Sequence, residues 1–448
     1  MKLRESVSAI FIAKDSKKVF SITRQDYLTV FPGYTAFPGG KVDRGDRETV
    51  EGRESPFKGI SDTHWKALSR EMKEELNFSL EENVAHIDSL YLLGTAITPE
   101  FNPYRFKAHF FCVILDTEIP FVVDEGEARE SCWLHASELK ARYDQCQLMA
   151  VPPIVMMLEY LAEDSFKRGP IDLSLPHIEE LEVPMIESIK GVKQFLPLSN
   201  TFPPANRTNS FIIGDAPLRL WVDPSPKDEV ELEKLLKSVF KIGYDALFIS
   251  HHHSDHHEFL PEIHKIKPVP VYMSKVTNDL IYKKWSKSYL SSMDIRLLKD
   301  GDIISKSEGE PLQVYEVPGH DEGQLALAPK SLSWFFVGDL IQTIGTVVIG
   351  DEEGDMTKYF ASLKRVMALS PKFCIPSHGI AIGGVHKLEM TLKHRLHREE
   401  TILEMKIQGK SDEEILKTIY EGINPALVPY AKKTIAAHLI KLKAEYKI

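Results

Sequence analysis

Long apolar runs, paired cysteines and an excess of positive charge are all missing from this chain of 448 residues. No apolar stretch approaches the ~20 residues that a membrane-spanning helix needs, so we do not expect a membrane protein. The four cysteines are scattered without a CxxC pair, which excludes a disulfide framework or a zinc ribbon and fits a cytoplasmic location. The net charge of -10 argues against a surface that binds nucleic acid throughout and leaves room only for a local basic patch.

At roughly 150 residues per domain, this length predicts about three domains. Alternating apolar strands first surround one strong helix near 65–76, later strands alternate with helical segments, and the end of the chain is helical. The first residues predict a strand rather than a signal peptide, because their apolar stretch is short and no cleavage region follows. We therefore predict a multidomain α/β and α+β chain with domains over 1–162, 195–384 and 385–448, and an acidic, proline-bearing linker over 163–194.

Histidine is concentrated in one place. Five of the seventeen histidines occupy a window of seven residues inside the stretch FISHHHSDHHEF. The largely apolar run DALFIS precedes them, so a buried strand delivers these side chains to the edge of a sheet. The spacing His251-x-His253-x-Asp255-His256 places three imidazoles and a carboxylate in one short loop, and such groups suit Zn²⁺ or a similar ion. The alternative is a histidine-rich surface loop without a metal.

Three more candidate ligands follow predicted strands or turns further along the chain. His320 lies on the Pro-Gly turn of VPGHDEG, Asp339 ends the apolar stretch SWFFVGD, and His378 follows the strand FCIPS. A strand, then a turn, then a ligand is a pattern that brings distant side chains together at one end of a sheet. The four segments together favour a metal site over the alternative.

The order HxHxDH, His, Asp, His resembles the metallo-β-lactamase fold superfamily, which implies an αβ/βα sandwich with two zinc ions. The resemblance implies that His251, His253 and His320 hold one ion, that Asp255, His256 and His378 hold the other, and that Asp339 bridges both. His252 and His257 lie outside this set. We expect His252 to point away from the metals and His257 to have a supporting or structural role.

Two zinc ions a few Å apart lower the pKa of a shared water to near neutrality, and Asp255 can orient or deprotonate that water. Esters, thioesters, lactams and phosphodiesters all fit such a site, so the motif predicts hydrolysis without fixing the bond. Many relatives follow the motif with two glycines, where this chain has Glu258 and Phe259. We therefore expect a bulkier wall beside the loop.

The C-terminal region gives a further resemblance. HRLHREETIL, followed by a helical segment rich in lysine, is similar to the lactamase-β-like subgroup, which carries a winged-helix-like C-terminal domain. That subgroup includes endoribonucleases that act on single-stranded RNA, whereas other relatives are glyoxalase II and thioesterases. The basic excess in this region is small, and a solvated face of terminal helices is the alternative explanation for it.

A second candidate site lies near the N-terminus, in FPGGKVDRGD and ALSREMKEELNF. On a helix, Glu71, Glu74 and Glu75 lie at i, i+3 and i+4 and share one face. Like charges placed so close destabilise a helix, and a bound Mg²⁺ or Mn²⁺ would compensate for them. The alternative is a charged solvent face that pairs with Arg70 and Lys73.

With Gly39 and Gly40 upstream, this segment resembles the Nudix box, which implies hydrolysis of a nucleoside diphosphate derivative. Asp46 replaces the usual Glu, Asn77 replaces a Gly that we expect to need a left-handed conformation, and twenty-three residues (47–69) replace seven. The insertion and the segments 97–115 and 151–163 resemble the coenzyme A diphosphatase subgroup. Arg24 fits the coenzyme A signature, but Thr29 stands where a second Arg is usual.

These patterns together predict a hydrolase with two centres, a Nudix diphosphatase and a dinuclear-zinc esterase or thioesterase. The expected catalytic residues are Asp255, Glu74 and Glu75, and the expected Nudix metal ligands are Glu71, Glu74 and Glu75. Arg24, Gly39 and Gly40 are expected to bind substrate, Arg70 to tie the helix to the loop, and Glu127 to be a further ligand or base or part of an acidic loop.

We expect a small nucleotide or coenzyme A derivative as the partner and no membrane. Two alternatives remain: an endoribonuclease or phosphodiesterase with a Nudix domain that binds nucleotide or RNA, and a sensor whose Nudix box only binds ligand.

Overall fold

The computed structural model describes residues 3–48, 55–99, 105–178, 180–286, 288–350 and 352–448. Parts of two segments used above, 100–104 of 97–115 and 49–54 of the insertion, lie outside the described residues. The chain forms two compact units, Met1–Pro176 with Ile186–Lys190, and His177–Met185 with Gly191–Ile448. None of the helices described here combines the length and apolarity needed to cross a bilayer.

The first unit is built on a mixed sheet with the strand order β3-β2-β1-β6-β5-β8, in which β4 also pairs with β1 and β7 with β2. The strands are β1 (Arg4–Ala13), β2 (Val19–Arg24), β3 (Thr35–Ala36), β4 (Gly39–Lys41), β5 (Ile87–Ile97), β6 (Phe106–Leu115), β7 (Ala128–Leu134) and β8 (Ile171–Asp172). The helices are η1 (Gly45–Arg47), α1 (Asp62–Leu76), η2 (Val84–His86), α2 (Ala136–Asp144) and α3 (Pro152–Glu163).

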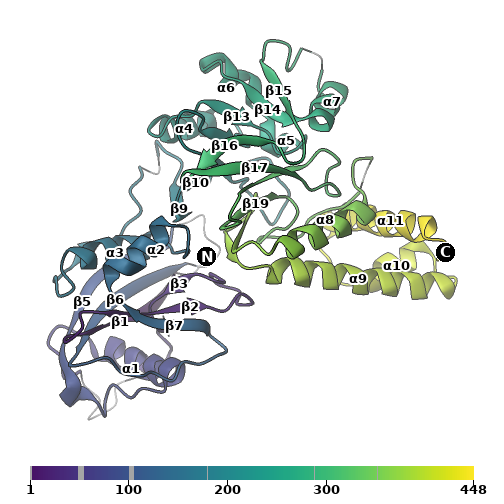
Figure 1. Ribbon diagram of the computed structural model, residues 1–448. Coiled ribbons are helices and arrows are strands. Elements are labelled where there is room, and N and C mark those ends of the chain that lie inside the picture. Colours follow the sequence, from purple (N-terminus) through teal and green to yellow (C-terminus); the bar gives the residue numbers. More distant parts are fainter. Residues whose placement is uncertain (1–2, 49–54, 100–104, 179, 287, 351) are drawn as a thin grey trace. The chain divides into compact units, whose positions relative to one another are not determined.

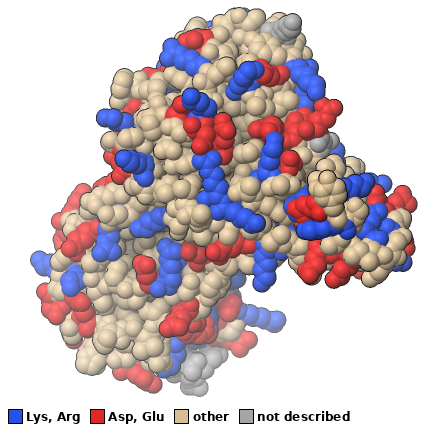
Figure 2. Space-filling model, turned by 45° about the vertical axis from the view of Figure 1, so that its right-hand side comes forward, with Lys and Arg blue, Asp and Glu red and all other residues tan. Residues whose placement is uncertain are grey.

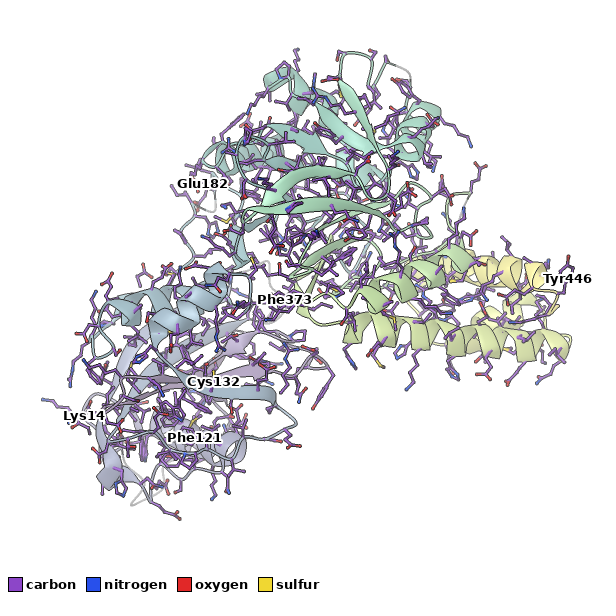
Figure 3. The ribbon with its side chains drawn as sticks, viewed as in Figure 1. Lys14, Phe121, Cys132, Glu182, Phe373 and Tyr446 are labelled. Atoms are coloured by element: carbon purple, nitrogen blue, oxygen red, sulfur yellow. The ribbon has the colours of Figure 1, made fainter. Side chains whose placement is uncertain are left out.

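Alternation along β1 places one core on each face of this sheet. Val7 and Phe11 pack toward α1, whereas Ile10 and Ile12 pack toward α2 and α3, as the two-residue period of a strand requires. The helices accordingly cover opposite faces of the sheet (Figure 1). Phe121, labelled in Figure 3, packs with its ring 4.8 Å from that of Phe11 in the core on the α1 side.

Helix α1 has clear start and stop signals. The side chain of Ser61 accepts a hydrogen bond from the backbone N–H of His64 at the N-terminus, which satisfies a donor that the helix itself leaves free. Asn77 ends the helix with φ 48° and ψ 34°. The left-handed exit predicted for this position is confirmed.

The second unit contains two sheets. Its first sheet has the strand order β15-β14-β13-β12-β11-β10 and its second the order β16-β17-β18-β19-β20-β21. Their strands are β10 (Val192–Phe195), β11 (Ser210–Ile213), β12 (Leu220–Val222), β13 (Ala246–Phe248), β14 (Val271–Ser274), β15 (Ile295–Leu298), β16 (Ile303–Ser307), β17 (Glu310–Glu316), β18 (Leu325–Pro329), β19 (Phe335–Gly338), β20 (Phe373–Pro376) and β21 (Ile382–Gly383). Apart from Met185, strand β9 (Met185–Ile189) belongs to the first unit.

The two sheets face each other, and helices cover their outer faces. Phe211 and Phe336 pack edge to face between the sheets, with ring centroids 5.4 Å apart. Side chains of α4 (Glu229–Phe240), α6 (Leu260–Ile266) and α7 (Lys275–Lys284) share a core with the first sheet, and those of α8 (Met356–Leu369) and α9 (His386–Ile407) share a core with the second. This is the αβ/βα sandwich that the resemblance to the metallo-β-lactamase fold implied.

A small helical domain follows the second sheet. It consists of the end of α9 with α10 (Asp412–Ile419), η3 (Pro425–Leu427) and α11 (Val428–Ala444), and these helices enclose a core of Ile402, Ile415, Ile435, Leu439 and Leu442. Within the described residues 384–448 no strand occurs, so the winged-helix-like domain expected here consists of helices alone. Basic and acidic side chains are interspersed on the face drawn in Figure 2.

Candidate functional site

In the second unit, the predicted ligands gather where three strands end. The short helix α5 (Ser254–His257) and the loop before it follow β13, Asp339 follows β19 directly, and His378 comes just after β20. Strands β19 and β20 are parallel neighbours, so their ends meet at one edge of the sheet. The strand order therefore brings Asp339 and His378 together, although they are far apart in the sequence.

Three imidazole nitrogens form the first group. Nδ1 of His253 lies 3.0 Å from Nε2 of His251 and 3.0 Å from Nε2 of His320. His251 is fully buried and His320 is 8% exposed. Three nitrogens at this spacing can bind one zinc ion as a tripod.

Asp255, His256 and His378 form the second group. Oδ2 of Asp255 lies 3.8 Å from Nε2 of His256 and 3.6 Å from Nε2 of His378. Asp339 lies beside both groups, with Oδ2 3.6 Å from Nε2 of His320 and 3.2 Å from Nε2 of His378. Its carboxylate is thus placed between the two groups, as a bridging ligand would be.

Two buried polar atoms test whether this site suits a metal. Nε2 of His256 and Oδ1 of Asp339 lie 3.8 Å apart, and neither has a hydrogen-bond partner among the described residues. Burying such groups without a partner is costly. A cation between them would satisfy both, so the residues fit a metal ion.

Asp223, a carboxylate that we did not predict, contacts the histidines on the side away from the candidate metal site. Oδ2 of Asp223, fully buried after β12, lies 2.8 Å from Nδ1 of His256 and accepts a 2.6 Å hydrogen bond from Ser250 Oγ. Ser250 Oγ lies in turn 3.0 Å from Nδ1 of His251. A partner on the far ring nitrogen fixes the orientation and tautomer of a metal-binding histidine. The sequence signal was present, because Asp223 ends the apolar strand LRLWVD in the same way as Asp339 ends its own strand.

Backbone carbonyls support the remaining histidines. Nδ1 of His320 donates to the carbonyl of Val348 at 2.8 Å, and Nδ1 of His378 donates to the carbonyl of Arg207 at 2.9 Å. In both rings Nε2 is therefore the atom left to face the site. Thr208 Oγ1 donates to Asp255 Oδ2 at 3.1 Å, which holds that carboxylate in place.

Charge is divided within the site. Burial and the neighbouring imidazoles of His256 and His253 hold the pKa of His251 well below its usual range, so its ring is neutral and able to bind a metal. Burial opposes charge on Asp339 as well, but His378 and His256 outweigh it and lower the pKa of this carboxyl. His251 and Asp339 thus have the forms in which these ligands bind zinc. Burial lowers the pKa of His256 and of His378, but the carboxylates of Asp255 and Asp339 outweigh it and raise both, so these two rings would release a proton when a metal binds.

The two remaining histidines of the cluster have other partners. Nδ1 of His252 contacts Asp321 Oδ2, and its Nε2 lies 3.5 Å from Glu353 Oε1. Nε2 of His257 donates to the carbonyl of His252 at 2.8 Å. Both rings thus make contacts outside the two groups, although His252 also lies near His253.

The candidate site of the first unit lies where α1 meets β4. Glu71 and Glu75 are 8% and 9% exposed, and the backbone N–H of Gly39 donates to Glu75 Oε2 at 2.9 Å. A Cβ added to Gly40 would lie 2.4 Å from Glu71 Oε1. A side chain at this position would therefore displace the Glu71 carboxylate from the place it occupies here.

Arg70 ties the helix to the preceding loop. Its Nη2 donates to Asp46 Oδ2 at 2.9 Å and to the carbonyl of Lys41 at 2.7 Å. Its Nη1 donates to Glu71 at 2.9 Å and to Glu74 at 3.1 Å. The Glu74 side chain is 59% exposed, so it lies more openly than Glu71 and Glu75.

Burial makes charge on these glutamates costly. It raises the pKa of Glu75 to about 8, with the N–H of Gly39 opposing the shift and the charge of Glu71 adding to it. Burial also raises the pKa of Glu71. Arg24 and Glu127 lie nearby, with Nη2 and Oε2 3.6 Å apart. A divalent cation would offset the charge of both buried carboxylates, so this site also fits a metal.

Models of three known families match different parts of this chain. The NUDIX domain model matches residues 2–150, the metallo-beta-lactamase superfamily model matches residues 207–378, and the beta-lactamase associated winged helix domain model matches residues 411–448. The chain is a fusion of a Nudix domain and a metallo-beta-lactamase domain. Both families are metal-dependent, and together they make the protein a hydrolase.

Three known proteins with different names are similar in sequence to part of this chain. The Beta-lactamase-like protein 2 homolog of Drosophila melanogaster is 26% identical over 257 residues, which cover 54% of this chain and 84% of that protein. An atrochrysone carboxyl ACP thioesterase of Aspergillus fumigatus is 25% identical over 44% of this chain and 58% of its own length. A hydroxyacylglutathione hydrolase of Bdellovibrio bacteriovorus is 28% identical over 37% of this chain and 60% of its own length. The matches to the thioesterase and to the hydroxyacylglutathione hydrolase thus span less than two thirds of the length of those proteins.

Solved structures of both domains resemble the fusion at low identity. A metallo-beta-lactamase family protein from Thermus thermophilus has a TM-score of 0.49, is 17% identical, and covers 57% of this chain and 94% of its own. A NUDIX hydrolase from Alicyclobacillus acidocaldarius has a TM-score of 0.32, is 20% identical, and covers 37% of this chain and 93% of its own.

Proposed function

We propose that the metallo-beta-lactamase domain hydrolyses a thioester and that the Nudix domain hydrolyses a nucleoside diphosphate derivative, with an acyl-coenzyme A or a related nucleotide as the substrate class. The proposal for the metallo-beta-lactamase domain rests on the position of Asp339 between the two groups of candidate ligands. The residues that would hold two zinc ions are His251, His253 and His320, then Asp255, His256 and His378, with Asp339 shared. Bound there, zinc supplies Lewis acidity and a more acidic water.

The chain's own residues would then direct the water. The pKa of Asp255 is below its usual range, because the nearby imidazoles of His256 and His378 outweigh the effect of burial. Ionised and held by Thr208, Asp255 accepts a hydrogen bond from the attacking water and orients it. The water oxygen bonds to the carbonyl carbon, the carbon–sulfur bond breaks, and the thiol leaves with a proton from that water.

In the Nudix domain, Glu71 and Glu75 would hold Mg²⁺ or Mn²⁺ against the diphosphate, with Glu74 as a further ligand from the more exposed side of α1. Water attacks one phosphorus, and one phosphorus–oxygen bond of the diphosphate breaks. Arg24, near Glu75, would contact a phosphate. Thioesterase and hydroxyacylglutathione hydrolase among the relatives support the first reaction. The Nudix family match supports the second.

A cross-over experiment tests both halves in the full-length protein. Purified protein loaded with Zn²⁺ and Mg²⁺ is given acyl-coenzyme A, nucleoside diphosphate derivatives and single-stranded RNA. His253→Gln should abolish thioester cleavage and spare diphosphate cleavage, and Glu75→Gln should do the reverse, so each variant is the control for the other. Cleavage of neither substrate by the wild type would refute the proposal. RNA cleavage lost in His253→Gln would support the endoribonuclease alternative instead.

A further inference from the structure

Three residues of the Nudix domain, none of them among its candidate glutamate ligands, bring nitrogen and oxygen atoms together. Glu5 belongs to β1, His109 to β6 and His64 to the first turn of α1. Strands β1 and β6 are parallel neighbours with Val7 opposite His109, so Glu5 and His109 emerge on the face that α1 covers.

The three groups have the spacing of metal ligands. Oε1 of Glu5 lies 3.0 Å from Nε2 of His64 and 3.2 Å from Nε2 of His109. Zinc–ligand bonds of about 2.0–2.1 Å in a tetrahedral arrangement place ligand atoms roughly 3.3 Å apart. The observed spacing is close to that value, and the two rings lie 4.4 Å apart at an angle of 40°.

An unpartnered atom provides the second observation. His109 is 8% exposed, and its Nε2 is buried with no hydrogen-bond partner among the described residues, although it faces the carboxylate of Glu5. The other ring nitrogen, Nδ1, lies 3.4 Å from Thr95 Oγ1. The ring is thus oriented with its free nitrogen toward Glu5 and His64, where a buried polar atom without a partner is costly.

We propose that Glu5, His64 and His109 form a third metal site, which binds one divalent transition metal ion of the zinc class. Two imidazoles and one carboxylate are suitable ligands for such an ion. Arg47 Nη2 donates to Glu5 Oε2 at 2.6 Å and leaves Oε1 for the metal. The Glu5 and His64 side chains are 24% and 18% exposed, so water can reach a fourth position.

This ion is separate from the one expected at the Nudix glutamates and would position their helix. His64 precedes Glu71 by seven residues, which is two turns or about 10 Å along α1. The ion would join the first turn of α1 to β1 and β6. It would thereby fix the N-terminal end of α1, and the C-terminal half of the same helix carries Glu71 and Glu75.

Metal analysis of the full-length protein tests the proposal. Wild type and variants are loaded with Zn²⁺ in excess Mg²⁺, dialysed against a weak chelator, and analysed by mass spectrometry for zinc per chain. His109→Gln and Glu5→Gln should each hold one zinc fewer than the wild type. His86→Gln, at an exposed histidine of the same domain, should hold as many as the wild type. His64→Cys keeps a zinc ligand and should also retain the ion.

The same preparations are checked for folding by circular dichroism. Zinc should raise the melting temperature of the Nudix domain in the wild type and in His64→Cys, and much less in Glu5→Gln. Equal zinc content in the wild type, His109→Gln and Glu5→Gln would overturn the proposal. If His109→Gln fails to fold, Glu5→Gln decides the matter, because it keeps the size of the side chain and removes only its charge.

Discussion

Oδ2 of Asp339 lies 3.2 Å from Nε2 of His378, and the same oxygen lies 3.6 Å from Nε2 of His320. One carboxylate thus contacts a member of each ligand group. If it bridges two ions, Asp339→Asn keeps the shape of the side chain but removes the charge that both ions share. We expect it to lose zinc and to lower thioester turnover by more than the roughly 10–100-fold that removal of a supporting partner costs.

The measurement is zinc content together with turnover. Glu322→Gln, at an exposed glutamate paired with Lys358, is the control and should change neither. Full zinc content and full turnover in Asp339→Asn would show that the carboxylate bridges nothing.

Asp223 supports two histidines without facing the site itself. Asp223→Asn weakens its contacts with Ser250 and His256, so we expect metal affinity to fall by about 10–100-fold. Competition with a chelator measures the affinity. Asp228→Asn is the control, because Asn caps the N-terminus of α4 as well as Asp does. Equal affinities in the two variants would contradict a supporting role for Asp223.

Gly40 and Gly45 form a matched pair in the Nudix domain. A Cβ at Gly40 would lie 2.4 Å from Glu71 Oε1, whereas a Cβ at Gly45 would meet nothing within 4 Å. Displacing a catalytic group by about 1 Å can cost 10²-fold in rate. We expect Gly40→Ala to lower diphosphate hydrolysis by about that factor and Gly45→Ala to leave it unchanged, with thioester cleavage constant in both. A Gly40→Ala enzyme as active as the wild type would place the reaction elsewhere.

The C-terminal helices should weaken in acid. Burial lowers the pKa of His438, whose Nδ1 lies 3.0 Å from Glu399 Oε2, so the folded protein keeps this ring neutral. Below the ordinary histidine pKa of about 6.5 the unfolded chain binds the proton more readily, and stability falls as the pH falls. The pKa of Glu399 is lowered, because hydrogen bonds from His438 and Lys441 outweigh burial, so its contribution is lost at still lower pH.

Hydrogen exchange of α9 and α11 between pH 7 and pH 5 measures this effect, after correction for the intrinsic rate. His438→Gln cannot take up a proton and should show a flatter pH dependence than the wild type. An unchanged pH dependence in this variant would mean that another group controls acid stability.

The sequence predicted the two families, and it singled out candidate ligands because each of their signals is local. Asp339 and His378 each follow a strongly apolar strand, and Glu71 and Glu75 share a helical face, so spacing alone reveals them. The left-handed conformation of Asn77 was an equally local prediction and is confirmed. The metal-binding and catalytic roles of these residues stay predictions.

Features that depend on strand pairing could not be predicted in this way. Glu5, His64 and His109 belong to no motif and meet only because β1 lies parallel to β6 under α1. Asp223 was missed because a single aspartate after a strand is common, and only its distance to His256 shows its role. The exposure of Glu74 depends on how α1 rotates on the sheet, which helical spacing alone leaves open.

The central claim is that the metallo-beta-lactamase domain holds two ions on either side of Asp339. Anomalous diffraction at the zinc absorption edge from zinc-loaded crystals tests it most directly. We predict two peaks roughly 3.5–4 Å apart, one beside His251, His253 and His320 and the other beside Asp255, His256 and His378. A single peak, or none, between these residues would contradict the account.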